Sequence, residues 1–184
     1  MQSLTQFPQS LVGRIQVPGD KSISHRALIL GAVAKGQTTI DHLLIAEDTL
    51  TTLNALQSLG IQITQKATQT RVNGQGGFQF TPNQTKLQMN NAGTATRLLI
   101  GLLAQQSVDI DLIGDQSLSQ RPMQRVMAPL MQMGANFKTT SQYLPVSIGA
   151  NSRLKPLNYQ IPVASAQVKS ALMLAAFKPM ELVS

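Results

Sequence analysis

The chain has 184 residues, of which 42% are apolar, 12% are charged and only 4% are aromatic, which is typical of a globular chain with an aliphatic core. Its formal net charge is +7 at pH 7, and it contains no cysteine and two histidines. This composition excludes a disulfide, a thiolate metal site and a cysteine nucleophile, and it disfavours any metal site. Because the basic residues are scattered, a small anionic substrate explains the charge as well as a nucleic acid does.

The N-terminus lacks the basic region and apolar core of a signal peptide, and no apolar run approaches the roughly 20 residues that span a bilayer. We therefore expect a cytoplasmic protein that has no membrane partner.

The stretch 17–30 combines a turn, polar residues that attract anions and the start of an apolar helix. Either Ser22 or Ser24 can cap that helix. Lys21 and Arg26 then lie near its N-terminal end, where free backbone N–H groups and the helix dipole favour negative charge. A phosphate or a carboxylate is the expected ligand.

Apolar periodicity, capping residues and glycines predict an alternation of strands and helices. The first unit is expected to have a strand over 11–17, a helix from about Ser24 to Lys35 ended by Gly36, a strand over 37–43, a helix from Glu47 to Leu59 ended by Gly60, and strands over 61–65 and 70–73. The second is expected to have a strand over 86–89, a helix from about 90 to Ala104, a strand over 108–113, a helix from Pro122 to Met133 that Pro129 kinks, and strands over 135–139 and 144–148. A third begins at 157–162 and continues into an apolar helix that reaches Phe177.

The chain contains an internal repeat of about 72 residues, because Arg26 recurs as Arg97 and then as Lys169. The units span about 16–80, 86–150 and 155–184, and the third is incomplete. In each unit a hydroxyl residue near a helix start precedes a base by three or four positions. The pairs are Ser22 with Arg26, Thr94 with Arg97, and Ser165 with Lys169. Three pairs in register favour helix N-termini arranged around one anionic site, and shared ancestry of the units is the alternative explanation.

Four motifs resemble those of the 5-enolpyruvylshikimate-3-phosphate synthases, in the same order and at sensible spacing. They are residues 19–27 (Gly-Asp-Lys-Ser-Ile-Ser-His-Arg-Ala), 91–94 (Asn-Ala-Gly-Thr) with Arg97, 114–123 (Gly-Asp-Gln-Ser-Leu-Ser-Gln-Arg-Pro-Met) and 165–171 (Ser-Ala-Gln-Val-Lys-Ser-Ala). The resemblance covers residues 11 to about 177. The family transfers the enolpyruvyl group of phosphoenolpyruvate to the 5-hydroxyl of shikimate 3-phosphate and releases phosphate, on the shikimate pathway to chorismate and the aromatic amino acids. Glyphosate competes for the phosphoenolpyruvate site in this family.

The resemblance implies that Lys21 is a catalytic residue that contacts both substrates. It also implies that Ser22, Arg26, Ser165 and Gln167 bind shikimate 3-phosphate. The reaction implied by the family needs no cofactor and no metal.

For phosphoenolpyruvate, the resemblance implies contacts from Lys21, Gly93, Arg121 and Gln167. A glycine at position 93 would let the backbone approach the ligand closely. The planar guanidinium of Arg121 would hold one of its oxyanions.

The implied fold is an inside-out α/β barrel of β-α-β-α-β-β units with the helices turned inward. The family has about six such units in two lobes, and this chain corresponds to about two and a half of them. Residues 1–15 would form a strand of the C-terminal lobe, and 16–184 would form an incomplete N-terminal lobe. Because the family's acid-base carboxylates belong to the part that this chain lacks, we expect an N-terminal fragment that is inactive alone. The intact enzyme is expected to be a monomer, whereas the uncovered apolar face at 172–177 favours self-association of the fragment.

Two other hypotheses remain open. The related UDP-N-acetylglucosamine enolpyruvyl transferases share the implied fold, but they typically have Asn where this chain has Ser22, and they usually have a catalytic cysteine. A non-catalytic domain that binds anions or RNA is the other, motivated by the net charge and by the fold's distant kinship with RNA phosphate cyclases. The even scatter of basic residues argues against a nucleic-acid partner.

Overall fold

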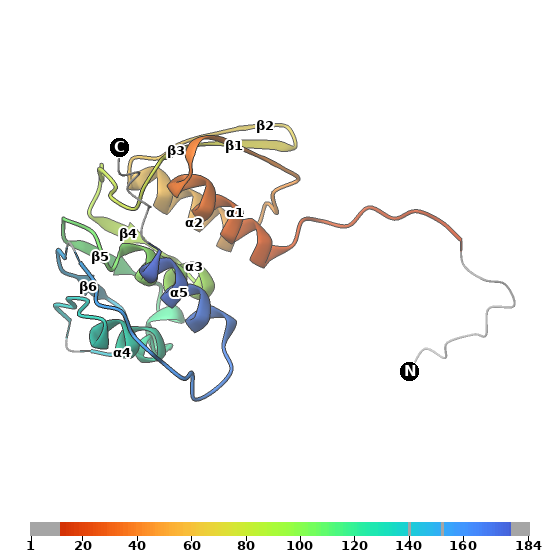
Figure 1. The fold of residues 1–184 in the computed structure, drawn as a ribbon. Helices are drawn as coiled ribbons and strands as arrows, with labels where there is room; N and C mark the ends of the chain where they lie inside the picture. The colour runs from red at the N-terminus through yellow and green to blue at the C-terminus, as the bar shows by residue number, and fades with distance from the viewer. Residues whose placement is uncertain (1–11, 140, 152, 178–184) are drawn as a thin grey trace, which may run out of the picture.

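A computed structural model describes residues 12–139, 141–151 and 153–177. Figure 1 shows the described elements, which alternate along the chain as a mixed α/β protein. In order they are α1 (Lys21–Val33), β1 (Lys35–Asp41), α2 (Glu47–Ser58), β2 (Gln62–Lys66), β3 (Gln69–Gln75), β4 (Lys86–Gln88), α3 (Gly93–Leu103), β5 (Ile110–Ile113), the 3-10 helix η1 (Leu118–Gln120), α4 (Gln124–Gln132), β6 (Val146–Ile148) and α5 (Ala166–Ala176).

The strands form two small sheets of three strands each. In the first the order is β1-β3-β2, and both pairs are antiparallel. In the second the order is β4-β5-β6, with β4 parallel and β6 antiparallel to β5. An isolated bridge between Phe137 and Ile148 adds one further pairing beside β6. In this order β5 and β6 correspond to β1 and β3, which agrees with the predicted repeat.

Helix α3 is the centre of the core. Nine of its eleven residues are buried, and Thr94 and Arg97 are the two that are not. It contacts α2, α4 and α5. The approach of α5 is close enough that a methyl group on Gly101 would overlap the carbonyl oxygen of Ala171. The glycine therefore permits the packing that fixes α5 beside α3.

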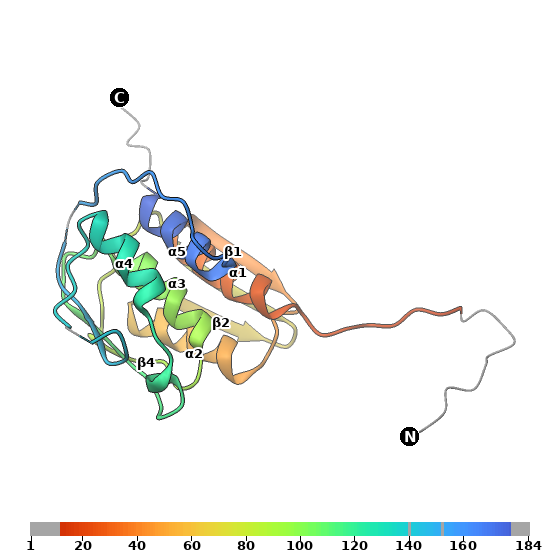
Figure 2. The ribbon, with the colours of Figure 1, turned by 90° about the horizontal axis from the view of Figure 1, so that it is seen from below.

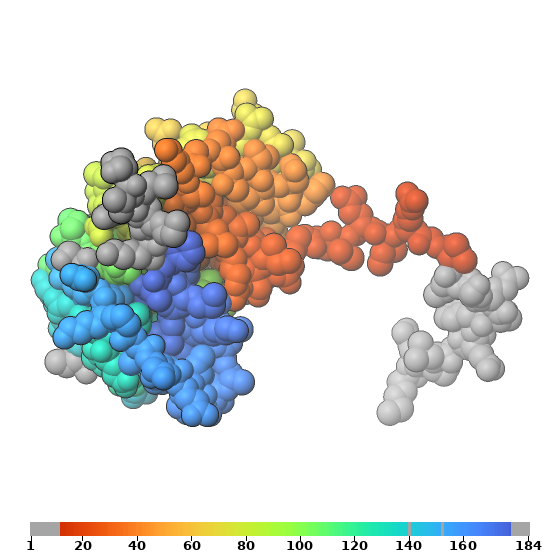
Figure 3. Space-filling view, in the orientation of Figure 1, coloured from red at the N-terminus to blue at the C-terminus, as the bar shows by residue number. Residues whose placement is uncertain are grey.

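The strand expected over 11–17 is wrong for 12–17, which form no strand, and residue 11 lies outside the described residues. Figures 1 and 3 show this segment leading away from the body of the molecule. The side chains of Val12 and Ile15 are 95% and 90% exposed. A strand needs a neighbour to accept its backbone hydrogen bonds, and none of the described strands lies beside this segment.

The first helix begins three residues earlier than expected, at Lys21, and its cap is Asp20 rather than a serine. The Asp20 carboxylate accepts from the Ile23 N–H (2.7 Å). Ser24 is buried, and its hydroxyl accepts from the Leu44 N–H (3.0 Å) instead. The helix ends at Val33, so Gly36 lies inside β1 and does not end the helix.

The other predicted elements are present with shifted ends, apart from two strands. Of 135–139, only Phe137 makes a sheet bridge, and 157–162 form no strand. The predicted strand at 144–148 is reduced to the three residues of β6. The prediction for α2 is correct to one residue, and α4 holds Pro129 in its interior as expected. A kink at Pro129 stays a prediction.

Candidate functional site

The N-terminal ends of α1, α3 and α5 lie on one side of the molecule, where residues 12–20 leave it (Figures 1 and 2). Two side-chain hydrogen bonds join these ends. The Gln167 amide of α5 donates to the Thr94 hydroxyl of α3 (3.0 Å), and the Arg26 guanidinium of α1 donates to the Ser170 hydroxyl of α5 (2.9 Å). Three helix starts, each with free backbone N–H groups, therefore meet at one surface.

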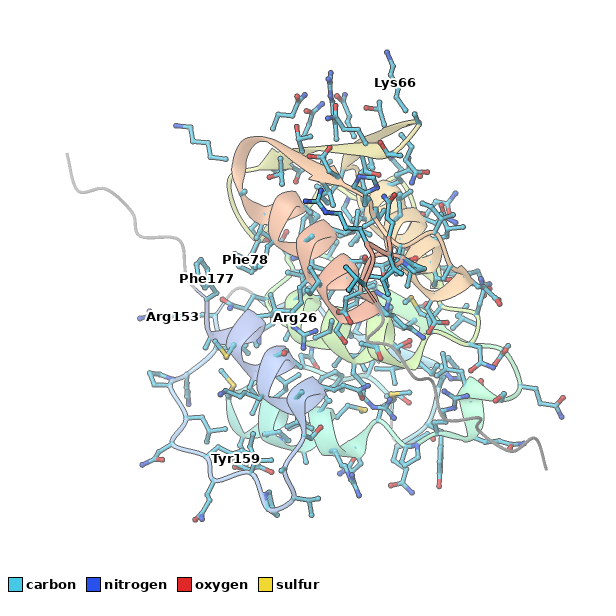
Figure 4. All side chains as sticks on the ribbon, turned by 90° about the vertical axis from the view of Figure 1, so that its right-hand side faces the viewer. Arg26, Lys66, Phe78, Arg153, Tyr159 and Phe177 are labelled. Carbon is cyan, nitrogen blue, oxygen red and sulfur yellow. The ribbon has the colours of Figure 1, made fainter. Side chains whose placement is uncertain are left out.

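Helix α1 contributes two cations to this surface. The Lys21 side chain is half exposed, and its amine forms an ion pair with Asp48 of α2. Figure 4 shows Arg26 between α1 and α5. Besides its bond to Ser170, Arg26 donates to the Ser22 carbonyl oxygen (3.1 Å), whereas Ser22 itself is exposed on the first turn. Both cations are held by the protein while their positions remain open to solvent.

Two arginines lie against Gly93 at the start of α3. A methyl group on Gly93 would lie 3.2 Å from Nη1 of Arg97 and 3.4 Å from Nη1 of Arg121. Arg97 donates to the carbonyl oxygens of Gly93 (3.3 Å) and Pro122 (3.2 Å). The missing side chain of Gly93 thus leaves room for two guanidinium groups beside the helix start.

Arg121 is held by neutral oxygens. Its Nη2 donates to the Asn91 side-chain oxygen (2.6 Å) and to the Ser117 hydroxyl (3.3 Å). The loop before it is ordered by Asp115, whose carboxylate accepts from the Leu118 N–H (2.7 Å). These contacts fix the orientation of the Arg121 guanidinium without neutralising its charge.

The arginine cluster, which we define as Arg97, Arg121 and Arg125, carries uncompensated positive charge. Burial lowers the pKa of Arg97, and repulsion from Arg121 and then Arg125 lowers it further. In the described part of the chain, the ion pairs are Lys21 with Asp48 and Lys138 with Asp109, so no described carboxylate pairs with the cluster. Like charges gathered at a helix N-terminus favour a multiply charged anion such as a phosphate.

Helix α5 contributes Ser165 and Gln167. The Ser165 hydroxyl caps the helix by accepting from the Val168 N–H (3.3 Å), as its place at a helix start predicts. Gln167 reaches α3 through Thr94. Lys169, by contrast, lines a cavity of about 1510 Å³ that Arg153 and Tyr159 also line.

The predicted pairing of hydroxyl and base takes a different form in the structure. Arg26 and Arg97 each donate to the backbone carbonyl oxygen four residues earlier, which belongs to Ser22 and to Gly93. The Thr94 hydroxyl instead accepts from Gln167. The repeat therefore preserves a bond from arginine to backbone, which depends on helix geometry and not on the hydroxyl.

Sequence reasoning placed Arg97 in the repeat but not among the site residues, and it missed Asn91, Ser117 and Arg125 as parts of the arginine cluster and its support. A signal existed for Ser117, which lies four residues before Arg121 in one motif. Asn91 lies 30 positions from Arg121, so only the folded chain brings them together. Within the described ranges, no group of three potential metal-ligating side chains occurs, and no helix is long and apolar enough to cross a membrane.

Comparison with known proteins decides the family. The family model described as EPSP synthase (3-phosphoshikimate 1-carboxyvinyltransferase) matches residues 5–183. The chain belongs to the EPSP synthase family. It is 52% identical over 169 residues to a 3-phosphoshikimate 1-carboxyvinyltransferase of Leuconostoc citreum, and 50% identical over 170 residues to one of Streptococcus pyogenes. Each alignment covers 91% of this chain, and 39% and 40% of the respective relative.

Solved EPSP synthase structures share the fold. An EPSP synthase from Acinetobacter baumannii superposes with a TM-score of 0.83 at 43% identity, covering 89% of this chain and 37% of that chain. The chain spans about two fifths of the length of the curated relatives it matches. These matches support the EPSP synthase hypothesis over the UDP-N-acetylglucosamine transferase and RNA-binding hypotheses.

Proposed function

We propose that this chain is the substrate-binding N-terminal lobe of an EPSP synthase, which transfers the enolpyruvyl group of phosphoenolpyruvate to the 5-hydroxyl of shikimate 3-phosphate and releases phosphate. The observation that carries the proposal is the arginine cluster at Gly93, because cations without described carboxylate partners suit two polyanionic substrates. Family membership supplies the reaction.

Shikimate 3-phosphate is assigned to the surface between α1 and α5. Ser22, Arg26, Ser165 and Gln167 are its proposed ligands, with Lys21 beside them. The hydrogen bond from Arg26 to Ser170 supports this assignment, because it brings the α1 and α5 residues to a common surface before any ligand binds. Such preorganisation lowers the entropy lost on binding.

Phosphoenolpyruvate is assigned to the start of α3. Gly93 and Arg121 are its proposed contacts, together with Lys21 and Gln167. Arg97 joins this set, because its Nη1 lies beside the space that a Gly93 side chain would fill. The guanidinium groups would stabilise the negative charge on the phosphate as it leaves.

Lys21 is the proposed catalytic residue of this lobe. Its amine would lie between the two anions and offset charge on both, and it would then exchange the Asp48 carboxylate for substrate oxygens. The acid-base carboxylates are assigned by the family to a second lobe. Because those carboxylates belong to the other lobe, the proposal implies that this chain binds substrate without turnover. The proposed fold is the inside-out barrel with its helices turned inward.

The test is a titration of shikimate 3-phosphate into the purified chain, followed by heteronuclear NMR. We expect localised shifts at the starts of α1 and α5, and their loss in Lys21→Ala and in Arg26→Ala. Lys138→Ala is the matched control, because Lys138 is also a half-exposed lysine in an ion pair. A well-folded sample without shifts, or equal shifts in all three variants, would contradict the proposed binding surface. Phosphate release by the chain alone would contradict the absence of turnover.

A further inference from the structure

Helices α1 and α2 are joined by two polar side-chain pairs that lie one turn apart. Lys21 forms an ion pair with Asp48, and Nδ1 of His25 lies 2.7 Å from the Thr52 hydroxyl. Lys21 and His25 are four residues apart on α1, as are Asp48 and Thr52 on α2, so each helix presents one face to the other. We call these four residues the α1–α2 ladder.

The second pair of the ladder is buried, whereas the first is open to solvent. His25 and Thr52 are both fully buried, while the Lys21 side chain is 50% exposed. Among the side-chain hydrogen bonds of the described residues, the one between His25 and Thr52 is the only one that links α1 directly to α2. A buried hydrogen bond of this kind fixes the relative position of two helices along their axes more firmly than an exposed ion pair does.

Only one of the two ring nitrogens of His25 has a hydrogen-bond partner among the described residues. Nδ1 of His25 and the Thr52 hydroxyl form one hydrogen bond, and that hydroxyl also lies 3.3 Å from the Asp48 carbonyl oxygen, to which it can donate. The other ring nitrogen, Nε2, is buried and has no hydrogen-bond partner in the described part of the chain. A buried polar atom without a partner destabilises a core, which makes plain core packing a poor reason for a histidine at this position.

Burial of the His25 ring favours its neutral form. Burial lowers the pKa of His25; Asp48 opposes this shift, while Lys21 and Arg26 strengthen it. A neutral ring adds no repulsion to Lys21 and does not compete with it for the Asp48 carboxylate. The ladder thus contains one cation, one anion and one neutral hydrogen-bonding pair.

We propose that His25 and Thr52 are positioning residues for Lys21. Their hydrogen bond fixes the position of α2 along α1, so that Asp48 faces the Lys21 amine. The ion pair with Asp48 then holds that amine at the N-terminal end of α1. Only the identity of the ligand that Lys21 meets rests on the proposed function. The positioning itself is a property of the two helices.

The first test measures the reactivity of the Lys21 amine by trace acetylation with acetic anhydride at mildly alkaline pH, with mass spectrometry as the readout. Lys138 is an internal standard, because it is paired with Asp109 and is 53% exposed. In Thr52→Val we expect the ratio of Lys21 to Lys138 labelling to rise roughly two- to fivefold, as loss of one exposed ion pair would produce. Thr52→Ser keeps the hydroxyl and is expected to match the wild type.

A control separates positioning from general loosening of the core. Thr96→Val removes a buried hydroxyl from α3, at the position that corresponds to His25 in the repeat. An unchanged labelling ratio in Thr52→Val, or an equal rise in Thr96→Val, would overturn the proposal. If the valine variant does not fold, Thr52→Ala gives the same comparison.

A second test uses shikimate 3-phosphate as the probe and compares two backgrounds. Thr52→Val is expected to weaken binding in the presence of Lys21 and to have no further effect in Lys21→Met, since effects transmitted through one residue are not additive. Equal weakening in both backgrounds would contradict positioning through Lys21. If the wild-type chain binds no shikimate 3-phosphate, the proposed function fails, while the acetylation ratio still decides the role of the ladder.

Discussion

At the start of α3, the absence of a side chain at Gly93 decides where two guanidinium groups lie. Nη1 of Arg97 and Nη1 of Arg121 occupy the space around the missing methyl group, and both point at the helix end. Because these groups are the ends of flexible side chains, a methyl group at position 93 would displace them and leave the backbone in place. The position therefore controls where the two guanidinium groups lie more than it controls the fold.

We expect Gly93→Ala to weaken binding of phosphoenolpyruvate, measured in the presence of shikimate 3-phosphate, roughly tenfold, or by about 1.4 kcal/mol. The physical reason is the shift of Arg97 and Arg121 away from the anion. Isothermal titration calorimetry gives the dissociation constant. Gly77→Ala is the matched control, since nothing lies within 4 Å of a methyl group there. An unchanged dissociation constant in Gly93→Ala would argue against an anion at this helix end.

The buried His25 makes the stability of the chain sensitive to acid. Its native pKa lies below the ordinary value of 6.5 because of burial, with Lys21 and Arg26 lowering it further and Asp48 opposing them. Below pH 6.5 the unfolded chain therefore binds more protons than the native one, and the free energy of unfolding falls as the pH falls.

Urea denaturation at about pH 7.5 and about pH 5.5 measures this dependence on pH. We expect His25→Asn to be less stable than the wild type at the higher pH but to lose less stability between the two values. His42→Asn is the control, because His42 lies in an exposed loop and adopts a left-handed backbone (φ 54°) that Asn tolerates. A pH dependence that is the same in His25→Asn and the wild type would contradict this account.

Among the elements, α1 shows how one capping residue decides which side chains lie in the first turn of a helix. Starting the helix at Lys21 rather than Ser24 puts Lys21 and Ser22 inside its first turn. Their side chains then project from the helix, and the serine hydroxyl is free of a capping role. Ser22 or Ser24 was expected as the cap, but the Ser24 hydroxyl bonds the Leu44 N–H and the Asp20 carboxylate caps the helix.

With Asp20 as the cap, substitutions at Asp20 and at Ser22 are expected to affect different properties, the first stability and the second binding. Asp20→Ala removes the cap and is expected to lower the free energy of unfolding by about 1 kcal/mol. Ser22→Ala is expected to change stability by less than about 0.5 kcal/mol, as exposed substitutions do, and to weaken binding of shikimate 3-phosphate. Chemical denaturation and calorimetry of both variants measure the two effects. Loss of stability in Ser22→Ala would assign the cap to the serine instead.

In the whole molecule, the third unit differs from the other two in how much of its helix is covered. Ile29 and Ile100 are buried, but Leu172 at the corresponding position is only partly buried. Met173 and Phe177 are 62% and 60% exposed. Figure 4 shows Tyr159 and Arg153 on the segment that passes beside α5, and the cavity of about 1510 Å³ lies between that segment and the helix.

This uncovered apolar surface predicts self-association of the chain. Sedimentation velocity over a range of concentrations is expected to show dimers or larger species, and Met173→Glu to shift them towards the monomer. Lys66→Glu, at the far end of the first sheet (Figure 4), is the control for a change of charge alone. A wild-type chain that stays monomeric at every concentration would contradict the prediction.

The sequence alone determined the order of elements, the repeat and the four motifs, because apolar spacing, turn residues and motif chemistry are local properties of the chain. Helix α2 was predicted to within one residue, since an acidic first turn, regular leucines and Gly60 all mark the same helix. The strand at 12–17 was predicted wrongly because its prediction also used local properties alone. Its residue types suit a strand, but a strand also needs a neighbour, which no local pattern can supply.

Tertiary structure alone decided how the motifs combine. Asn91 orients Arg121, and Ser170 orients Arg26. Lys21 is oriented by its ion pair with α2, a helix that begins 26 positions later, at Glu47. Each contact joins residues that are distant in sequence, and its geometry follows from how α1, α2, α3 and α5 pack with the loops before α3 and α4. The sequence specifies which charges the chain has, and the packed helices decide that Arg97 and Arg121 lie beside Gly93 while Lys169 lines a cavity.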